Sequence, residues 1–378
     1  MKITDIVGTV VRAEYRPEYR KDKRFYVKDE VQANVIVQVH TDEGVVGIGE
    51  AAHTPGLYGE TAAATVGGIE LLKSGLVGLD PLELTHANAV MDRYSLGGNI
   101  AAKAGIDIAL HDLAGKVIGV PVYQLLGGRV HQGVRTHITP ATYENTPADM
   151  ARLMTEGYRV FKQKMSGDTE YDINIVRELL PIIGENVILS LDANQAWSVN
   201  QTLYIARILE REVGLNQKVI FEQPILANDV RGMARIRREI RFPVMADDGI
   251  RTVGDLTRVI DNEAADIVSL KISRVGGIQK CQQMIKVAEA ANVDYIVDEI
   301  NEMRVANTAV AHLAVASRSP LYTGTACHTL FEVDIVTEGG VTITNGIADV
   351  SDRPGLGIGS ATLLGLDLPA DESIVLGA

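Results

Sequence analysis

The sequence predicts an α/β protein in which a (β/α)8 barrel is joined to a second domain. At 378 residues the chain exceeds what one ordinary hydrophobic core supports, so two domains are expected. From about residue 130 onward, short β-branched runs alternate with amphipathic helical segments. Eight such runs favour a barrel over an open sheet, and no GxGxxG fingerprint opens a helix. We expect barrel strands at residues 134–139, 159–165, 187–193, 218–223, 242–247, 266–272, 294–299 and 320–326.

Residues 1–125 are predicted to form the second domain, of the α+β class. The apolar runs at 31–39 and 45–51 flank the turn sequence TDEG, a pattern typical of a β-hairpin. Helical periodicity follows and is clearest over residues 99–119, where the pattern ends at a glycine that precedes a proline by two positions.

The rest of the chain divides at the point where the alternation of strands and helices stops. We assign residues 126–339 to the barrel, because the alternation of strands and helices spans them. Residues 340–378 lose this rhythm, with one strand expected at 340–350 and a loop at 354–360. A tail of this kind could run back to the N-terminal domain.

The composition argues against nucleic-acid and membrane partners. The net charge of −13 disfavours binding to phosphate backbones or anionic lipids, and aromatic residues make up only 5% of the chain. No stretch reaches the ~18–20 apolar residues of a membrane span, and the N-terminus lacks the apolar region of a signal peptide. The only cysteines, Cys281 and Cys327, cannot form a disulfide framework, so we expect a cytoplasmic protein.

Five ionisable residues stand at or near the ends of successive apolar runs. They are Lys164, Asp192, Glu222, Asp247 and Lys271, spaced by roughly the length of one strand–helix–loop unit. Core packing does not explain a charge at the end of an apolar strand. In a closed barrel these strand ends meet at one mouth, which is where barrel enzymes hold their active sites.

The three carboxylates predict a magnesium site. Asp192, Glu222 and Asp247 would repel one another if they converged without a cation, and burial would raise their pKa values. A hard divalent cation with oxygen ligands relieves this repulsion, and Mg²⁺ suits such a site. The alternative is that a neighbouring arginine or a helix N-terminus satisfies each carboxylate separately.

The lysines predict a proton transfer. Lys162 and Lys164 lie two apart on one strand and therefore face the same side, which in a barrel is the interior. The alternative is a solvated surface pair, although the flanking residues are apolar. Lys271 lies on the sixth strand, opposite the second strand of an eight-stranded ring. Two opposed lysines could remove a proton from one face of a carbon and return it to the other, while the metal stabilises an enediolate.

These residues lie in motifs that resemble the enolase superfamily, and within it the muconate-lactonizing-enzyme subgroup of the mandelate racemase/muconate lactonizing enzyme family. The resemblance covers essentially the whole chain. The motifs are IAAKAGIDIALHDLAGK (100–116), PVYQLLGG (121–128), KQK (162–164), LDANQAW (191–197), FEQP (221–224), MADD (245–248) and LKISRVGG (270–277).

The resemblance implies a modified (β/α)8 barrel closed by an α+β capping domain that both chain ends form. It implies that Asp192, Glu222 and Asp247 bind one Mg²⁺ ion per subunit. Lys164 and Lys271 would be the acid/base pair, and Lys162 an electrostatic helper. A homo-oligomer is also implied.

The chain departs from known subgroups in three places. DYIVDEINEM (294–303) contains no histidine, which argues against the acid-sugar dehydratases that use one there. Asp248 stands where many members carry Glu. ACHTLFEVDIV (326–336) matches neither the muconate cycloisomerases nor the DxD of dipeptide epimerases, so the substrate stays open.

Several segments are candidates for substrate binding. The basic, aromatic segment 16–26, which ends at Tyr26, is expected to lie over the barrel mouth as a lid, or else to be a solvated charge run. The loop 53–61 brings Tyr58. Asn194 follows the third barrel strand, and Thr329 follows the eighth.

Acidic residues follow the last two barrel strands. Asp298, Glu299 and Glu302 come after the seventh strand, and Glu332 and Asp334 after the eighth. If some of them face the cavity, they favour a substrate with an amino or ammonium group. The alternative is that they cap helices or pair with Arg304.

The leading prediction is a Mg²⁺-dependent isomerase that abstracts the proton α to a substrate carboxylate through an enediolate. Racemisation or epimerisation of an amino-acid derivative comes first. The alternatives are cycloisomerisation of a muconate-like diacid, syn-dehydration with the same lysines, and a metal-binding barrel without turnover.

Overall fold

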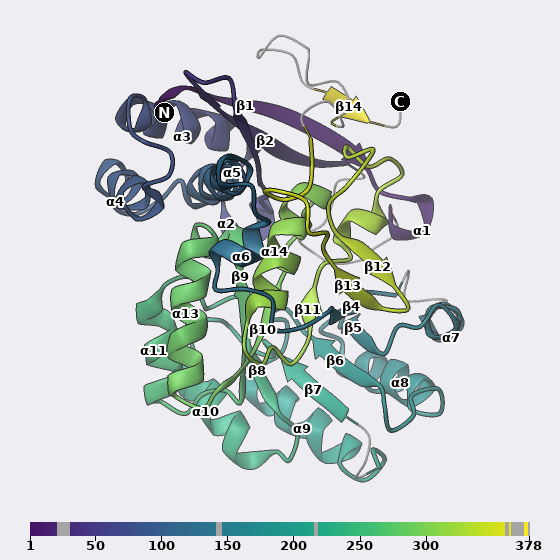
Figure 1. The fold of residues 1–378 in the computed structure, drawn as a ribbon. Coiled ribbons are helices and arrows are strands. Elements are labelled where there is room, and N and C mark those ends of the chain that lie inside the picture. Colours follow the sequence, from purple (N-terminus) through teal and green to yellow (C-terminus); the bar gives the residue numbers. More distant parts are fainter. Residues whose placement is uncertain (21–30, 141–145, 215–217, 360–362, 364–373, 377–378) are drawn as a thin grey trace.

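Two β-sheets organise the chain in the computed structural model (Figure 1). The structure describes residues 1–20, 31–140, 146–214, 218–359, 363 and 374–376. Within them, a ten-stranded sheet has the order β12-β13-β4-β11-β10-β9-β8-β7-β6-β5, and a four-stranded sheet has the order β14-β1-β2-β3.

The larger sheet contains the predicted barrel. Strands β5 to β11 pair in parallel with their neighbours, and β11 pairs with β4. The ring closes at a bridge between Ile138 and Phe161, where Ile138 N donates to Val160 O at 3.1 Å. Each of the eight expected strands is found. They are β4 (Val134–His137), β5 (Val160–Lys164), β6 (Ile188–Asp192), β7 (Lys218–Glu222), β8 (Val244–Ala246), β9 (Ile267–Lys271), β10 (Asp294–Asp298) and β11 (Thr323–Gly324).

Helices follow the barrel strands and cover the outside of the ring (Figure 1). The strand β11 departs from the pattern, because the 3-10 turn η1 (Cys327–Leu330) follows it in place of a long helix. The helices of this half are α7 (Thr146–Thr155), α8 (Thr169–Leu179), α9 (Val199–Leu209), α10 (Val230–Glu239), α11 (Val253–Asp261), α12 (Ile272–Val275), α13 (Ile278–Ala290) and α14 (Arg304–Ala316).

The smaller sheet contains the expected N-terminal hairpin. Strands β2 (Val31–Thr41) and β3 (Val46–Ala51) pair antiparallel, and β1 (Ile3–Glu14) pairs with β2. The C-terminal strand β14 (Ile374–Leu376) pairs in parallel with β1, so the end of the chain returns to this sheet. The helices of the N-terminal half are α1 (Pro17–Arg20), α2 (Pro55–Tyr58), α3 (Ala62–Leu76), α4 (Leu84–Tyr94), α5 (Ile100–Ile118) and α6 (Val122–Leu125).

The prediction of one strand at 340–350 is wrong in detail. The segment forms a hairpin, β12 (Thr342–Thr344) and β13 (Ile347–Asp349), and β13 pairs with barrel strand β4. The turn lies at Asn345 and Gly346, which have φ values of 52° and 69°. Asn-Gly adopts this left-handed backbone readily and so favours a tight two-residue turn.

Helix α5 lies between the two sheets and packs closely against β3. A side chain at Gly49 would place its Cβ 2.0 Å from the carbonyl oxygen of Gly105, so the contact requires glycine. Asp107 of α5 accepts a hydrogen bond from Ile278 N, at the start of α13, at 2.6 Å. Asp112 accepts from Ile48 N and Leu356 N, both at 2.8 Å.

Glu50 of β3 provides a further link to the barrel half. Its carboxylate accepts hydrogen bonds from Met303 N at 2.7 Å and from Ala306 N at 2.9 Å, at the beginning of α14. Helix N-termini leave backbone N–H groups without intrahelical partners, and a carboxylate satisfies them. A residue of the small sheet therefore caps a barrel helix.

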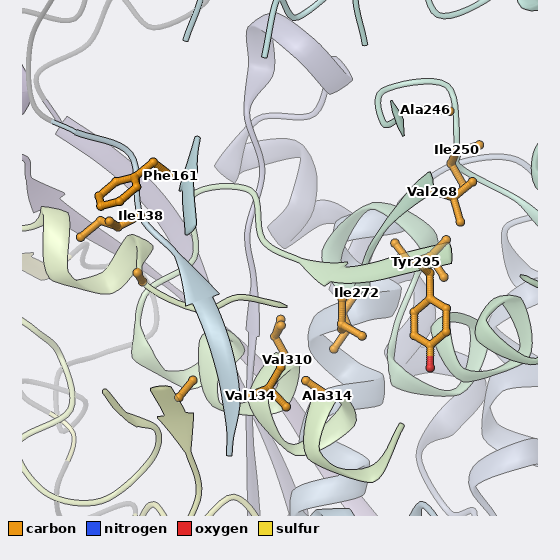
Figure 2. Close-up of a cluster of buried hydrophobic side chains, with 14 of the residues drawn as sticks. Val134, Ile138, Phe161, Ala246, Ile250, Val268, Ile272, Tyr295, Val310 and Ala314 are labelled. Carbon is orange, nitrogen blue, oxygen red and sulfur yellow. The ribbon is translucent and has the colours of Figure 1, made fainter. Parts of the chain in front are cut away.

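Side chains alternate between the inside and the outside of the barrel strands. One apolar layer fills the interior of the barrel and consists of Val160, Ile188, Ile220, Met245, Ile267, Ile296 and Tyr322. The intervening residues, such as Phe161 and Val268, pack outward in the main core (Figure 2). Residues two positions beyond the interior layer must therefore also face inward, nearer the carboxyl ends of the strands.

No helix in the part of the chain that the structure describes is both long and apolar enough to cross a membrane.

Candidate active site

The inward positions beyond the apolar layer carry polar side chains. Lys162, Glu222 and Asp247 follow Val160, Ile220 and Met245 by two residues on their strands or just after them. Asp192 pairs in register with Lys164 on one side and with Glu222 on the other. Because side chains alternate along each strand, the apolar layer inside the barrel is followed, toward the mouth, by a layer of charged side chains.

Asp192, Glu222 and Asp247 converge as the sequence predicts. All three are buried, and one carboxylate oxygen from each lies within 4.8 Å of the others. Both oxygens of Glu222 also accept hydrogen bonds from protein groups. Ser190 Oγ donates to one at 2.6 Å, and Lys162 Nζ donates to the other at 2.7 Å. This grouping is the geometry that a bound cation needs.

The donor chemistry of this group fits a hard divalent cation. Burial, together with the nearby charge of Asp192, raises the pKa of Glu222 to about 7 even though Lys162 opposes the shift. Each carboxylate contacts a lysine or an arginine, so the alternative of separate partners holds in part. Those partners do not separate the three carboxylates, however, and an all-oxygen set suits Mg²⁺.

Lys164 and Lys271 lie on opposite walls of one cavity. They end β5 and β9, which are separated by β6, β7 and β8 on one side and by β10, β11 and β4 on the other. Lys164 Nζ contacts Asp192 and donates to Asn194 Oδ1 at 3.0 Å. Lys271 Nζ donates to Asp247 at 2.9 Å. Each lysine therefore stands beside one of the three carboxylates.

Asp298 is the buried counter-ion of Lys162 and Lys271. Its carboxylate lies 3.0 Å from Lys162 Nζ, 3.5 Å from Lys271 Nζ and 2.7 Å from His137 Nε2. Ser269 Oγ also donates to it at 2.9 Å. Burial raises the pKa of Asp298, but the two lysines outweigh burial and hold the pKa well below its ordinary value. Asp298, a substrate-binding candidate from the sequence, therefore already has its hydrogen-bond and ion-pair partners within the protein.

A narrow cavity of about 50 Å³ opens between the two acid/base candidates. Of the predicted substrate-binding residues, Tyr58 and Asn194 line it. The lining residues are Thr54, Leu57, Tyr58, His137, Thr139, Lys162, Lys164, Asn194, Lys271, Glu299, Ile300, Asn301, Cys327 and Leu330.

The other predicted substrate-binding residues lie elsewhere. Glu302 is buried, accepts a hydrogen bond from Ser273 Oγ at 2.8 Å and does not line this cavity. Thr329 donates its hydroxyl to Ala326 O at 2.7 Å and does not line it either. Tyr26 and most of the expected lid lie outside the described residues.

Two models of known sequence families match the chain. The mandelate racemase/muconate lactonizing enzyme N-terminal domain matches residues 26–127. The enolase C-terminal domain-like family matches residues 146–361, more than half of the chain.

The chain belongs to the mandelate racemase/muconate lactonizing enzyme family.

Relatives of the chain include epimerases, a racemase, a dehydratase and a muconate cycloisomerase. A cis-3-hydroxy-L-proline dehydratase from Roseibium aggregatum is 34% identical over 335 residues, which are 87% of this chain and 88% of the relative. The structure of an N-succinyl Arg/Lys racemase from Bacillus cereus superposes with a TM-score of 0.88 at 30% identity, covering 96% of this chain and 97% of the other. A dipeptide epimerase from Cytophaga hutchinsonii, solved with Mg and the dipeptide D-Ala-L-Val, gives a TM-score of 0.86 at 30% identity, covering 95% and 96%.

Sequence reasoning gave no role to Arg274, although the residue lies inside the family motif LKISRVGG. Its guanidinium is buried and donates to Asp247 at 2.7 Å, to Ser269 O at 2.7 Å and to Ile250 O at 2.9 Å. It holds one oxygen of Asp247 in place, while Lys271 contacts the other. The signal in the sequence was an arginine three residues after a barrel lysine, followed at once by an apolar residue and two glycines.

Sequence reasoning also missed Asp172, which joins two loops of the family's barrel mouth. Its carboxylate accepts hydrogen bonds from Ser166 N at 2.7 Å, Gly167 N at 3.0 Å and Trp197 Nε1 at 2.7 Å. Trp197 is buried, and its ring lies against Phe221, so it packs behind the Asp192 loop. No motif marked Asp172, because its contacts join two separate loops, and Trp197 in the second loop lies 25 residues away along the chain.

Proposed function

We propose that this protein is a Mg²⁺-dependent racemase or epimerase that acts at the carbon α to the carboxylate of an amino-acid derivative. The observation that carries the proposal is the placement of Lys164 and Lys271 on opposite walls of one cavity, beside the group of three carboxylates. Removal of a proton from one face and its return to the other require two such groups.

Asp192, Glu222 and Asp247 would hold the ion. When bound, Mg²⁺ would bind the substrate carboxylate and offset the negative charge that develops on it as the α proton leaves. The chain's own residues fix the geometry around that position. Arg274 orients Asp247, and Ser190 with Lys162 orients Glu222.

The proton transfer uses the two lysines in turn. One lysine, as a neutral amine, takes the α proton, and the electron pair of the broken C–H bond delocalises into the substrate carboxylate. The other lysine, as an ammonium, delivers its proton to the opposite face and forms the new C–H bond. The configuration inverts, and the two lysines exchange protonation states. For the opposite enantiomer their roles reverse.

Lys162 has a positioning and electrostatic role in this scheme. Burial lowers its pKa, but Asp298 and Glu222 outweigh burial, so its pKa lies well above the ordinary value. It therefore stays an ammonium and adds a fixed positive charge below the reacting carboxylate. Its two ion pairs, at 2.7 Å and 3.0 Å, hold it in place.

Relatives support this choice of reaction, because one is named a racemase and another a dipeptide epimerase. Syn-dehydration with the same lysines is the second candidate, and the Roseibium dehydratase at 34% identity favours it. Cycloisomerisation and a barrel without turnover remain alternatives that no contact in the site favours.

Hydrogen exchange at the α carbon tests the proposal. The protein would be incubated in D₂O with Mg²⁺ and a panel of amino acids, N-acylated amino acids and dipeptides, and the α-proton signal followed by NMR. We expect loss of this signal together with inversion of configuration for at least one compound class. Exchange without inversion but with release of water would support the dehydratase. Absence of exchange from every compound while Mg²⁺ is bound would refute both.

Substitution of each lysine tests the two-base assignment. Lys164→Ala and Lys271→Ala should each lower racemisation by at least ~10²-fold, because general acid–base catalysis contributes about that much. Each variant should keep exchange of only one enantiomer, at the lysine that remains. Lys286→Ala, on the exposed side of α13, is the matched control and should keep full activity. Unchanged racemisation in either active-site variant would contradict the assignment.

The wider organisation of the protein follows the same proposal. Residues 1–125, with the end of the tail returning through β14, would form the capping domain, and residues 126–339 the barrel, to which the hairpin β12–β13 of the tail also pairs. A homo-oligomer in the cytoplasm that binds a small-molecule carboxylate, and no nucleic acid, fits the net charge of −13 and the two free cysteines. Light scattering on the purified protein would give the number of subunits.

A further inference from the structure

Glu299 lines the cavity beside the seventh barrel strand and is only 4% exposed. Its contacts with the protein are hydrogen bonds to neutral groups. Asn307 Nδ2 and the backbone N–H of Cys327 both donate to Glu299 Oε2 at 2.9 Å. These donors come from α14 and from η1, so two elements hold the carboxyl group in one position against the cavity.

No described lysine, arginine or histidine forms an ion pair with Glu299. The neighbouring acids differ in this respect, since Asp298 pairs with Lys162 and Lys271, and Asp334 pairs with Arg304 at 2.6 Å. Burial, reinforced by Glu302 and Asp298, raises the pKa of Glu299 to about 8. A buried acid without a cation is costly unless a ligand supplies one.

His137 adds a second acceptor to the same wall. Its Nε2 lies 2.7 Å from Asp298, and burial together with Lys162 lowers the pKa of the imidazole to about 4, so the ring is neutral. A neutral ring that faces a carboxylate donates through Nε2, which leaves Nδ1 as an acceptor. Nδ1 is buried and has no hydrogen-bond partner among the residues described.

We propose that Glu299 binds a cationic nitrogen of the substrate, so that the substrate is an amino acid with a free or alkylated ammonium group on its α carbon. This inference rests on the proposed function, because it places the substrate carboxylate at the three metal-binding carboxylates. The N–H groups of the ammonium would point toward the wall that Glu299 and His137 form.

The charges of the cavity match such a zwitterion. The lysines and the bound cation attract the carboxylate end, and Glu299 attracts the ammonium end. An N-acylated amino acid has a neutral amide at this position and would leave Glu299 without a cation. A diacid of the muconate kind would set a second negative charge against the carboxyl group, which is unfavourable.

Glu299→Gln tests the proposal, because glutamine keeps the shape and an oxygen that accepts from Asn307 and Cys327. The ligands are a free amino acid, its N-methyl form and its N-acetyl form, and kcat/KM for α-proton exchange in D₂O is measured for each. We expect the wild type to prefer the ammonium-bearing forms. The variant should lose about 10- to 100-fold on them, mainly through KM, and little on the N-acetyl form.

Asp334→Asn is the control, since this acid also follows a late barrel strand but pairs with Arg304 and does not line the cavity. It should leave the preference among the three ligands unchanged. If Glu299→Gln does not fold, Glu299→Asp keeps the charge and should keep the direction of the preference.

Three results would overturn the proposal. One is a wild type that exchanges only the N-acetyl form, which leaves the proposed racemase standing but refutes the cationic subsite. Another is an equal loss on all three ligands in Glu299→Gln, which assigns Glu299 a purely structural role. Absence of exchange from every ligand refutes the racemase itself and with it this subsite.

Discussion

Asp298 and Glu299 are neighbours in sequence, yet their electrostatic surroundings are opposite. Asp298 ends β10 and points into the barrel, where two lysines hold its pKa well below the ordinary value despite its burial. Glu299 follows it and contacts α14 and η1, and burial raises its pKa to about 8. Successive side chains of an extended chain point in opposite directions, so Asp298 faces the lysines inside the barrel and Glu299 faces the neutral donors of α14 and η1.

This contrast predicts that ligand binding releases a proton. At pH 7 most Glu299 carries its proton, because its pKa is about 8. An ammonium ligand stabilises the carboxylate and lowers this pKa, so binding at pH 7 should release up to about one proton, and at pH 9 almost none. Affinity should therefore rise as the pH rises through 8. Calorimetry in two buffers of different ionisation enthalpy measures the released protons.

Glu299→Gln has no proton to release at this position. The same titration of the variant should show no change in proton release between pH 7 and pH 9. Proton release that persists in the variant would place the titrating group elsewhere in the cavity.

At the scale of elements, Asp172 connects the loop after β5 to the loop after β6. Asp172→Asn replaces an acceptor oxygen by an amide that faces backbone or indole N–H donors. We expect a loss of about 1–3 kcal/mol in the free energy of unfolding, because buried donors lose their partner. Urea unfolding followed by circular dichroism measures this loss.

Asp168→Asn is the matched control in the same helix. Asp168 is the N-cap of α8 and accepts from Tyr171 N at 2.9 Å. Asparagine caps helices about as well as aspartate, so this variant should stay within ~0.5 kcal/mol of the wild type. Equal losses in both variants would mean that Asp172 acts only as part of the helix terminus.

The barrel strands and the central site were predictable from the sequence because both follow local patterns. A strand alternates with period two, so an apolar run that ends in a charge places that charge inside the barrel, as with Asp192 and Glu222. The Asn-Gly turn of the hairpin at 342–349 is a local signal, but its pairing with the barrel was not predictable in this way, since the partner β4 lies about 200 residues earlier. The state of Glu299 depends on Asn307 and Cys327, and spacing along the chain does not reveal such partners.

At the scale of the whole molecule, α5 joins the small sheet to the barrel. Asp107→Ala would leave Ile278 N, at the start of α13, without its acceptor, and Asn88 Nδ2 would lose its 2.6 Å hydrogen bond to Asp107 and keep the one to Leu84 O at 3.1 Å. We expect a loss of about 1–3 kcal/mol in the free energy of unfolding, because one buried donor is left without its acceptor and a second loses one of its two hydrogen bonds. Scanning calorimetry measures it, and amide hydrogen exchange should show faster opening at Ile278.

Asp107→Asn is the control, because it keeps one acceptor for Ile278 N and should lose less stability than Asp107→Ala. If Asp107→Ala instead matches the wild type, water replaces the carboxylate and the link between the two halves lies elsewhere.

The contact of Glu50 with α14 has a consequence for protein engineering. One way to change the specificity of a capped barrel is to build a chimera, in which the N-terminal half of one relative is fused to the barrel of another. Here the carboxylate that completes a barrel helix belongs to the small sheet, through Met303 N and Ala306 N. A chimera joined near residue 125 would therefore need an acid at position 50 from its donor, or its barrel would begin α14 with unsatisfied amides beside the cavity.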